Sequence, residues 1–410
     1  MNGILPGQTL VPGLIPMKNK IVEQLDFSKS YCIKPSTKCL LSDKKLLDKI
    51  TDFPIIPKNS LIIVNDHYRS TPTQRIVKLL REAGKISKPI TFLIATGSHL
   101  PPTENVAIEL TGAVKGDNIL YHDVRYTKDY SFAGKTSRGT EVFFNPVLEQ
   151  FDKIITIGSV EPHYFAGFTG GAKSLMPGVV AKKTIAQNHK WAMDPDSTIM
   201  KTKGNPVFED IWEAANLIVP LEQVYSIQLA NHGPSVLNIS LGLLSEAFKE
   251  ARKVSEKVYG KWLDKKFDRI LSFVASPLDK NLYQSQKAIE NTKNVLKEGG
   301  TMVLIAECSE GIGTADFFER LQLSGTPENV LKTISNENYQ FGDHKAYKLA
   351  EFVSKSKLLY VGNLSKATAS KAYMTKVTVE ELVGLYKNWT EDGNDILIDE
   401  AGGFTACCLA

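Results

Sequence analysis

Short apolar, β-branched runs alternate with amphipathic stretches along most of this 410-residue chain. The runs at residues 61–66 and 153–160 are apolar almost throughout, which predicts strands buried on both faces of a sheet. Residues 73–83 place their apolar side chains on one helical face, and Gly84 follows as a stop signal. Because strands that alternate with helices indicate a parallel sheet covered on both sides, the fold class predicted is α/β.

The pattern starts again near residue 268, after a long polar-faced helix predicted over residues 243–264 that could serve as a hinge. We therefore expect two domains, 1–260 and 261–410, each built on a largely parallel sheet flanked by helices. The aromatic, turn-containing segment at residues 130–144 predicts a hairpin in the first domain. The active site is expected in the cleft between the domains.

Charge and cysteine content narrow the class of protein. The 49 basic and 45 acidic residues are dispersed and give a net charge of only +4, so no nucleic-acid partner is expected. No apolar run reaches 18 residues, and prolines interrupt the first twenty residues, so we expect neither a membrane span nor a signal peptide. The 5 cysteines include no C-x-x-C pair, which favours a reducing, cytoplasmic location.

Polar side chains with chemical capacity follow the predicted strands, where parallel α/β sheets collect their active-site residues. Asp66 and Arg69 follow one strand, and His99 and His163 follow two others. His189 comes in a predicted helix after a glycine-rich segment. Histidine is suited to proton transfer near neutral pH and to metal binding, although a single loop histidine is more often an ordinary surface residue.

The glycine-rich segment GFTGGAKSLMPG, residues 167–178, is the densest signal in the chain. Gly170 and Gly171 would let the backbone approach a ligand closely, with Lys173 beside them. A phosphate-binding P-loop is the alternative interpretation, which would make the protein a P-loop-like kinase or ATPase. Against it, Ala172 stands where the P-loop pattern needs glycine, and a Pro-Gly pair follows the lysine closely.

A third group of polar residues opens a predicted helix of the second domain. Gln284 and Lys287 are three positions apart, and Tyr283 and Lys287 are four apart, so these side chains share one helical face. Alone, this would be an ordinary polar helix surface.

Together these segments resemble the nickel-dependent lactate racemase family. The resemblance rests, in chain order, on DHYRSTPT, ATGSHLPPT, GSVEPHYFAGFTGGAKSLMPG, QNHK and YQSQK. It covers residues 60–290 densely and the GDHKA region near residue 342 more thinly. The segment from Glu161 to Ser174 is its longest and most specific part.

The resemblance implies a racemase or epimerase that inverts the hydroxyl-bearing carbon of a small 2-hydroxy acid by transient hydride transfer to a nickel pincer nucleotide. By motif, Lys173 carries this cofactor covalently, His189 binds the nickel, and His99 and His163 are the catalytic acid/base pair. Arg69 and Lys287 are expected to hold the substrate. The cofactor contacts expected are Asp66, Gly170, Gly171, Tyr283 and Gln284.

The partners implied are a small anionic 2-hydroxy acid and the proteins that synthesise the cofactor. Tyr347 falls where another large aromatic side chain near the substrate is expected, so the substrate can differ from lactate. A member that only binds the cofactor or metal is a further alternative. A pure binder, however, has no use for both His99 and His163 as acid/base groups.

Overall fold

The computed structural model describes residues 15–37 and 40–410 and divides them into two compact units. The N-terminal unit comprises Pro35–Gly260 and Ile334–His344. The C-terminal unit comprises the described residues up to Lys34, together with Lys261–Thr333 and Lys345–Ala410. Cys39 and the first fourteen residues, on which the prediction of no signal peptide depends, lie outside the described residues.

The N-terminal unit is built on a six-stranded sheet in the order β11-β10-β7-β2-β3-β4. All neighbouring strands pair in parallel except β10 and β11, which are antiparallel. The strands are β2 (Ser60–Asn65), β3 (Thr91–Ala95), β4 (Asn118–Tyr121), β7 (Lys153–Ser159), β10 (Tyr225–His232) and β11 (Ser235–Leu243). This confirms the predicted largely parallel α/β sheet.

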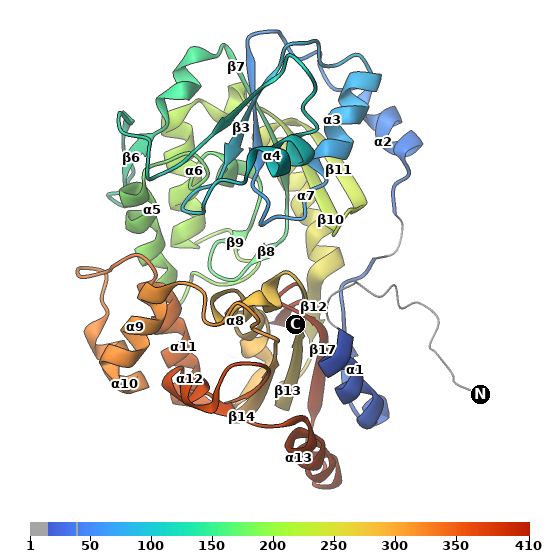
Figure 1. Ribbon diagram of the computed structural model, residues 1–410, viewed down its shortest axis with the longest axis vertical. Coiled ribbons are helices and arrows are strands. Elements are labelled where there is room, and N and C mark those ends of the chain that lie inside the picture. Colours follow the sequence, from blue (N-terminus) through green and yellow to red (C-terminus); the bar gives the residue numbers. More distant parts are fainter. Residues whose placement is uncertain (1–14, 38–39) are drawn as a thin grey trace. The chain divides into compact units, whose positions relative to one another are not determined.

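Helices cover this sheet, as Figure 1 shows. They are α2 (Asp43–Ile50), α3 (Thr73–Glu82), α4 (Glu104–Thr111), α5 (Lys182–His189), α6 (Pro206–Ile218) and α7 (Leu244–Tyr259). One buried apolar cluster contains Leu46, Ile76 and Val77, so α2 and α3 pack over one face of the sheet. A second contains Ile185, Ile211 and Leu244 from α5, α6 and α7. These two clusters explain why the central strands are apolar on both faces.

Two features of this unit bear on the predictions. The expected hairpin forms from β5 (Ser131–Lys135) and β6 (Glu141–Phe144), which pair antiparallel. Helix α7 was predicted as a polar hinge, but it groups wholly with the N-terminal unit and buries Ala247, Phe248 and Ala251. Its apolar stripe therefore makes it a packed layer of that unit.

The C-terminal unit contains a second six-stranded sheet, parallel throughout, in the order β1-β17-β13-β14-β15-β16. The strands are β1 (Tyr31–Ile33), β13 (Phe267–Val274), β14 (Leu296–Ile305), β15 (Lys357–Val361), β16 (Thr375–Lys376) and β17 (Ile396–Gly402). A small ladder joins β12 (Gly260–Leu263) to β18 (Ala406–Leu409). Its helices are α1 (Ile15–Gln24), α8 (Leu282–Thr292), α9 (Ala315–Ser324), α10 (Pro327–Thr333), α11 (Asp343–Lys355), α12 (Lys366–Lys371) and α13 (Val379–Glu391).

Two segments group with a different unit than a simple division of the chain at residue 260 would give. Strand β1 pairs with β17, with Tyr31 opposite Leu397, so the first described residues belong to the C-terminal sheet. Residues 334–344 lie in the second half of the sequence but group with the N-terminal unit. An active site in a cleft between the predicted domains stays a prediction.

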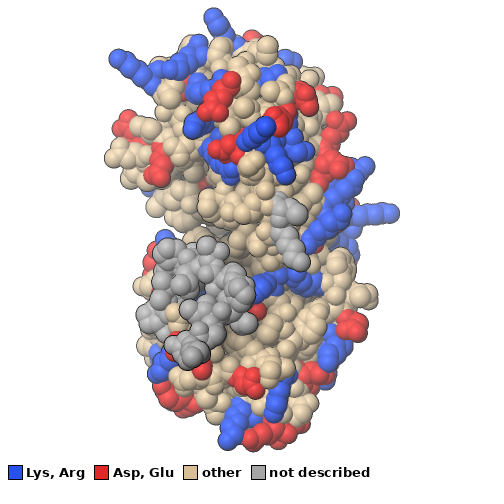
Figure 2. Space-filling model, turned by 90° about the vertical axis from the view of Figure 1, so that its right-hand side faces the viewer, with Lys and Arg blue, Asp and Glu red and all other residues tan. Residues whose placement is uncertain are grey.

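The surface mixes charges of both signs. Figure 2 shows Lys and Arg side chains interleaved with Asp and Glu over the visible face. Within the described part of the chain, no helix has the length and apolar character needed to cross a membrane.

Candidate functional site

The predicted catalytic residues of the N-terminal unit lie around the point where its strand order reverses. The chain passes from β2 to β3 on one side and from β7 to β10 on the other, so the reversal falls between β2 and β7. Ligands of open α/β sheets bind at the carboxyl ends of strands beside such a point. Asp66 directly follows β2, while Glu161 lies two residues beyond the end of β7.

Asp66 and His99 form a direct pair across the ends of β2 and β3. The Oδ2 atom of Asp66 lies 2.7 Å from Nδ1 of His99. A carboxylate is an acceptor, so Nδ1 of His99 donates and the neutral ring keeps Nε2 as an acceptor. The other carboxylate oxygen of Asp66 accepts from the backbone N–H of Tyr68 at 3.2 Å. Asp66 is buried, while the His99 side chain is 41% exposed, so the ring is anchored at one end and accessible at the other.

Arg69 lies beside a carboxylate that the sequence predictions did not include. Its Nη1 atom lies 4.0 Å from Oε2 of Glu161, and its backbone N–H donates to the carbonyl of Asp66 at 3.2 Å. Glu161 is buried and follows β7, so the guanidinium lies beside the same reversal point. The only sequence signal for Glu161 was its place at the start of the specific motif.

His163 lies on a two-stranded ladder formed by β8 (Pro162–His163) and β9 (Gly167–Phe168). The backbone N–H of Ala166 donates to Nδ1 of His163 at 3.3 Å, so the neutral ring carries its proton on Nε2. The ring meets Phe165 edge to face, with 4.6 Å between centroids. His163 and His99 therefore present opposite ring tautomers.

The glycine-rich segment forms a tight turn. Residues Gly171–Ser174 make one 3-10 turn, and the backbone N–H of Gly171 donates to Oε1 of Gln228 at 2.9 Å. A Cβ atom on Gly170 would lie 2.6 Å from the same oxygen, and one on Gly171 would lie 2.7 Å from Phe248. Both positions need glycine because protein atoms press against them, and both have positive φ.

This geometry disfavours the P-loop alternative. A P-loop offers free backbone N–H groups and opens an α-helix directly after its lysine. Here the N–H of Gly171 is already bonded, the N–H of Lys173 donates to the carbonyl of Gly170 at 3.1 Å, and α5 begins only at Lys182.

Lys173 and His189 converge on Phe165. The Lys173 amine lies 5.7 Å from the Phe165 ring centroid, and the rings of His189 and Phe165 are 5.1 Å apart. Burial, reinforced by the positive charge of Lys173, lowers the pKa of His189 from 6.5 to about 3. His189 is therefore neutral at physiological pH, the form in which imidazole binds a metal.

A polar relay fixes the orientation of the His189 ring. Its Nδ1 atom lies 3.1 Å from Oδ1 of Asn188, and the Asn188 amide donates to Asp210 at 2.8 Å. An Nδ1–H that donates to an amide oxygen leaves Nε2 directed to a ligand. The metal-binding prediction for His189 fits this arrangement.

Two further rings near His189 come from residues 334–344, and sequence reasoning missed both. Phe341 stacks on His189 at 6.1 Å, and His344 meets it edge to face at 5.6 Å between centroids. His344 is not among the site residues expected from the sequence. The Nδ1 atom of His344 lies 2.7 Å from the hydroxyl of Tyr339, so His344 contacts both Tyr339 and the His189 ring. His344 lies in the GDHKA region that carries the resemblance only thinly, and that signal did not indicate its contact with His189.

The remaining predicted residues begin α8 in the C-terminal unit. Asn281 caps this helix by accepting from the backbone N–H of Gln284 at 3.0 Å, which fixes the first turn that also contains Tyr283. Burial raises the pKa of the Tyr283 hydroxyl to about 12, so it stays a neutral donor. Lys287 lies one turn further along the same helix.

Two family descriptions match this chain. The lactate racemase N-terminal domain matches residues 48–200, and the lactate racemase C-terminal domain matches residues 268–398. Together they cover more than half of the sequence.

Two curated relatives are named lactate racemase. The protein from Thermoanaerobacterium thermosaccharolyticum is 31% identical over 294 residues, 68% of this chain and 66% of the relative. The protein from Lactiplantibacillus plantarum is 27% identical over 296 residues, 70% of this chain and 69% of the relative. The match thus spans slightly less than two thirds of the first relative's length.

Solved structures show the same fold. The lactate racemase apoprotein from T. thermosaccharolyticum superposes with a TM-score of 0.82 at 22% identity, covering 94% of this chain and 96% of that one. A Thermotoga maritima protein gives a TM-score of 0.71 at 16% identity, covering 92% of this chain and 100% of that one. On the two domain matches and the 31% identical relative, this chain belongs to the lactate racemase family.

Proposed function

We propose that the protein is a racemase or epimerase that inverts the hydroxyl-bearing carbon of a small 2-hydroxy acid with the help of a nickel pincer nucleotide. The observation that supports this most is that the Lys173 amine and the His189 ring both lie against Phe165, where burial and the charge of Lys173 lower the pKa of His189. A phosphate-binding loop has no need of a histidine kept neutral beside its lysine. A metal-bearing cofactor attached to that lysine does.

The residues fit this cofactor by their donor chemistry. Lys173 would hold it covalently through its amine, and Nε2 of His189 would bind the nickel. The chemistry that the bound group supplies is the reversible acceptance of the substrate carbon's hydrogen as hydride. This avoids a carbanion next to a carboxylate. Tyr283 and Gln284 would add contacts from α8.

His99 and His163 would handle the hydroxyl proton at opposite faces of the substrate. Because Asp66 holds Nδ1–H of His99, Nε2 of that ring accepts the proton from the hydroxyl group. His163 carries its hydrogen on Nε2 while Nδ1 accepts from Ala166, so it starts as a donor toward the substrate oxygen. For His163 to accept a proton at Nε2, a proton must occupy Nδ1 and the bond from Ala166 must be given up.

Arg69 would bind the substrate carboxylate while the rest of the molecule turns. A guanidinium forks onto a carboxylate with two parallel hydrogen bonds, and Glu161 keeps it oriented. Lys287 would add a second positive charge. We further propose that the cellular substrate is a lactate-like anion, that cofactor-synthesising proteins are partners, and that the enzyme acts in the cytoplasm.

The test is intact mass and metal analysis of protein produced together with the cofactor-synthesising proteins. We expect a mass increment located at Lys173 and about one nickel per chain, neither of which should appear in Lys173→Ala. His189→Ala should keep the increment and lose most of the nickel. If a related racemase loads in the same host and this chain acquires neither adduct nor nickel, the proposal is wrong.

A further inference from the structure

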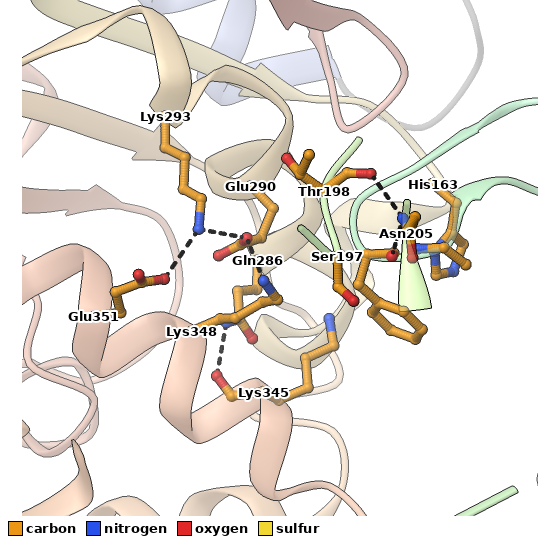
Figure 3. Close-up of polar contacts among 12 residues, drawn as sticks. His163, Ser197, Thr198, Asn205, Gln286, Glu290, Lys293, Lys345, Lys348 and Glu351 are labelled. Carbon is orange, nitrogen blue, oxygen red and sulfur yellow. Dashed lines mark hydrogen bonds and ion pairs between the residues drawn. The ribbon is translucent and has the colours of Figure 1, made fainter. Parts of the chain in front are cut away.

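A cluster of buried and half-buried charged residues lies between α8 and α11 within the C-terminal unit. Lys293 lies 2.9 Å from Glu290 and 3.4 Å from Glu351, and Lys348 lies 4.0 Å from Glu290 (Figure 3). Lys345, on α11, is also buried, with 2% of its surface exposed. Lys345 and Lys348 are buried, whereas the Lys293 side chain is 20% exposed.

Lys345 contacts the first turn of α8. Its Nζ atom donates to the backbone carbonyl of Tyr283 at 2.8 Å and lies 4.7 Å from the centroid of the Tyr283 ring. In return, the side-chain amide of Gln286 donates to the carbonyl of Lys345 at 2.8 Å (Figure 3). The two helices are thus joined by a reciprocal pair of hydrogen bonds that brackets the turn bearing Tyr283 and Gln284.

Burial of a lysine in this position lowers the stability of the folded state, because the charged amine loses its hydration. Burial and the nearby charge of Lys287 lower the pKa of Lys345 well below its ordinary value, although Glu290 opposes this. An apolar side chain of similar length would fill the space without that desolvation cost. We therefore relate the contact between Lys345 and the Tyr283 carbonyl to the backbone that it fixes. That backbone belongs to a turn predicted to touch the cofactor and substrate.

We propose that Lys345 is a positioning residue of this active site, which from α11 holds the first turn of α8 so that Tyr283, Gln284 and Lys287 keep their places. Its identification as an active-site residue rests on the proposed function, whereas its hold on α8 does not. Lys293 supplies the contrast, because it is a half-buried lysine of the same cluster that pairs with two carboxylates.

The first experiment uses the cofactor-free full chain and measures amide hydrogen exchange of α8 by mass spectrometry. In Lys345→Met we expect roughly tenfold faster exchange in the peptide spanning the first turn, since local opening becomes easier. The melting temperature should be unchanged or raised, because the desolvation cost is gone. Lys293→Met should lower the melting temperature, since it leaves Glu290 and Glu351 without that cation, and should leave the first turn protected.

The second experiment uses nickel-loaded enzyme and D- and L-lactate as probes. Lys345→Met should raise KM about tenfold with a smaller change in kcat, Lys345→Arg should recover part of the loss, and Lys293→Met should retain the wild-type KM. Gln286→Leu, which removes the return bond, should weaken the same turn and serves if Lys345→Met does not fold.

The outcomes separate the two ideas. Unchanged exchange in both Lys345→Met and Gln286→Leu would overturn the positioning proposal. Altered exchange with unchanged KM would also overturn it, because the turn would then not serve the site. A loaded wild-type protein that turns over no 2-hydroxy acid would instead refute the proposed function, while the exchange result would still decide whether Lys345 holds α8.

Discussion

Both six-stranded sheets of this protein contain a reversal of strand order, but the residues that lie at the two reversal points differ in exposure and in their partners. In the N-terminal unit, the ends of β2 and β7 present Asp66 and Glu161, whose partners His99 and Arg69 remain accessible. In the C-terminal unit, the reversal falls between β13 and β17, and Lys18 of α1 donates to the carbonyl of Val274 there.

At the C-terminal reversal point, the charged side chains of Asp399 and Lys18 are partly or fully buried and have partners within the same unit. Asp399 of β17 is buried and accepts from Ser272 at 2.9 Å, and its pKa is raised by burial to about 6. Burial likewise lowers the pKa of Lys18 to about 8, with opposing contributions from Asp279 and Asp399. The difference teaches that the same reversal of strand order can carry accessible polar side chains in one unit and buried, mutually bonded ones in the other.

The largest effect is expected from substitutions at the reversal point between β2 and β7 of the N-terminal unit. His99→Ala should lower kcat of the loaded enzyme by about 10²–10⁴, as expected for a general base. Asp66→Asn should lower it less, because the ring survives but loses the acceptor that fixes its tautomer. Steady-state kinetics check this, with nickel content measured in each variant. Full turnover in both would mean that this end of the sheet is not catalytic.

A smaller effect is expected from the guanidinium beside Asp66. Arg69→Lys should raise KM about tenfold, because a lysine keeps the charge but loses the bidentate fork. Glu161→Gln should raise KM less, since it only weakens the orientation of Arg69 at 4.0 Å. Initial rates over a range of lactate concentrations distinguish these variants. A kcat loss without a KM change would assign Arg69 to another task.

A substitution at the reversal point between β13 and β17 should change the stability of the protein rather than its kinetics. Lys18→Met removes the cation from beside buried Asp399, which should cost about 1–3 kcal/mol in the free energy of unfolding. Urea denaturation measures this, and KM and kcat of the loaded enzyme should match wild type. Altered kinetics with intact stability would mean that this crevice also serves the reaction.

The smallest effect concerns a histidine at the outer edge of the N-terminal sheet. His122 follows β4, Nε2 donates to the carbonyl of Val180 at 3.0 Å, and burial lowers its pKa from 6.5 to about 4. The unfolded chain binds a proton near pH 6.5 and the folded chain does not, so stability is full above pH 6.5 and falls as the pH drops toward 4.

Between pH 7.5 and 5.5 this amounts to roughly 1 kcal/mol. His122→Gln should show a correspondingly flatter dependence of unfolding free energy on pH, measured by denaturation at several pH values. An identical slope in the variant would assign the acid sensitivity to other groups.

The sequence allowed the parts of this architecture with a local signal to be predicted. Apolar runs marked β2, β7 and β13, and the dense motif marked the segment that contains His163 and the turn bearing Lys173. The pairing of β1 with β17 could not be predicted, because contact between Tyr31 and Leu397 leaves no trace in the local pattern of either segment. Glu161 and His344 lie in segments that carry the resemblance, but their partners Arg69 and Tyr339 are identified only once the chain has folded.

That pairing between the first and last strands of the C-terminal sheet has a consequence for synthesis. A ribosome releases β1 long before Ile396–Gly402 exists, so β1 must wait for its partner while almost all of the intervening chain emerges. The newborn sheet therefore has an open edge at β13 until the final strand inserts between β13 and β1. A chain truncated before β17 would leave two exposed strands, which invites aggregation.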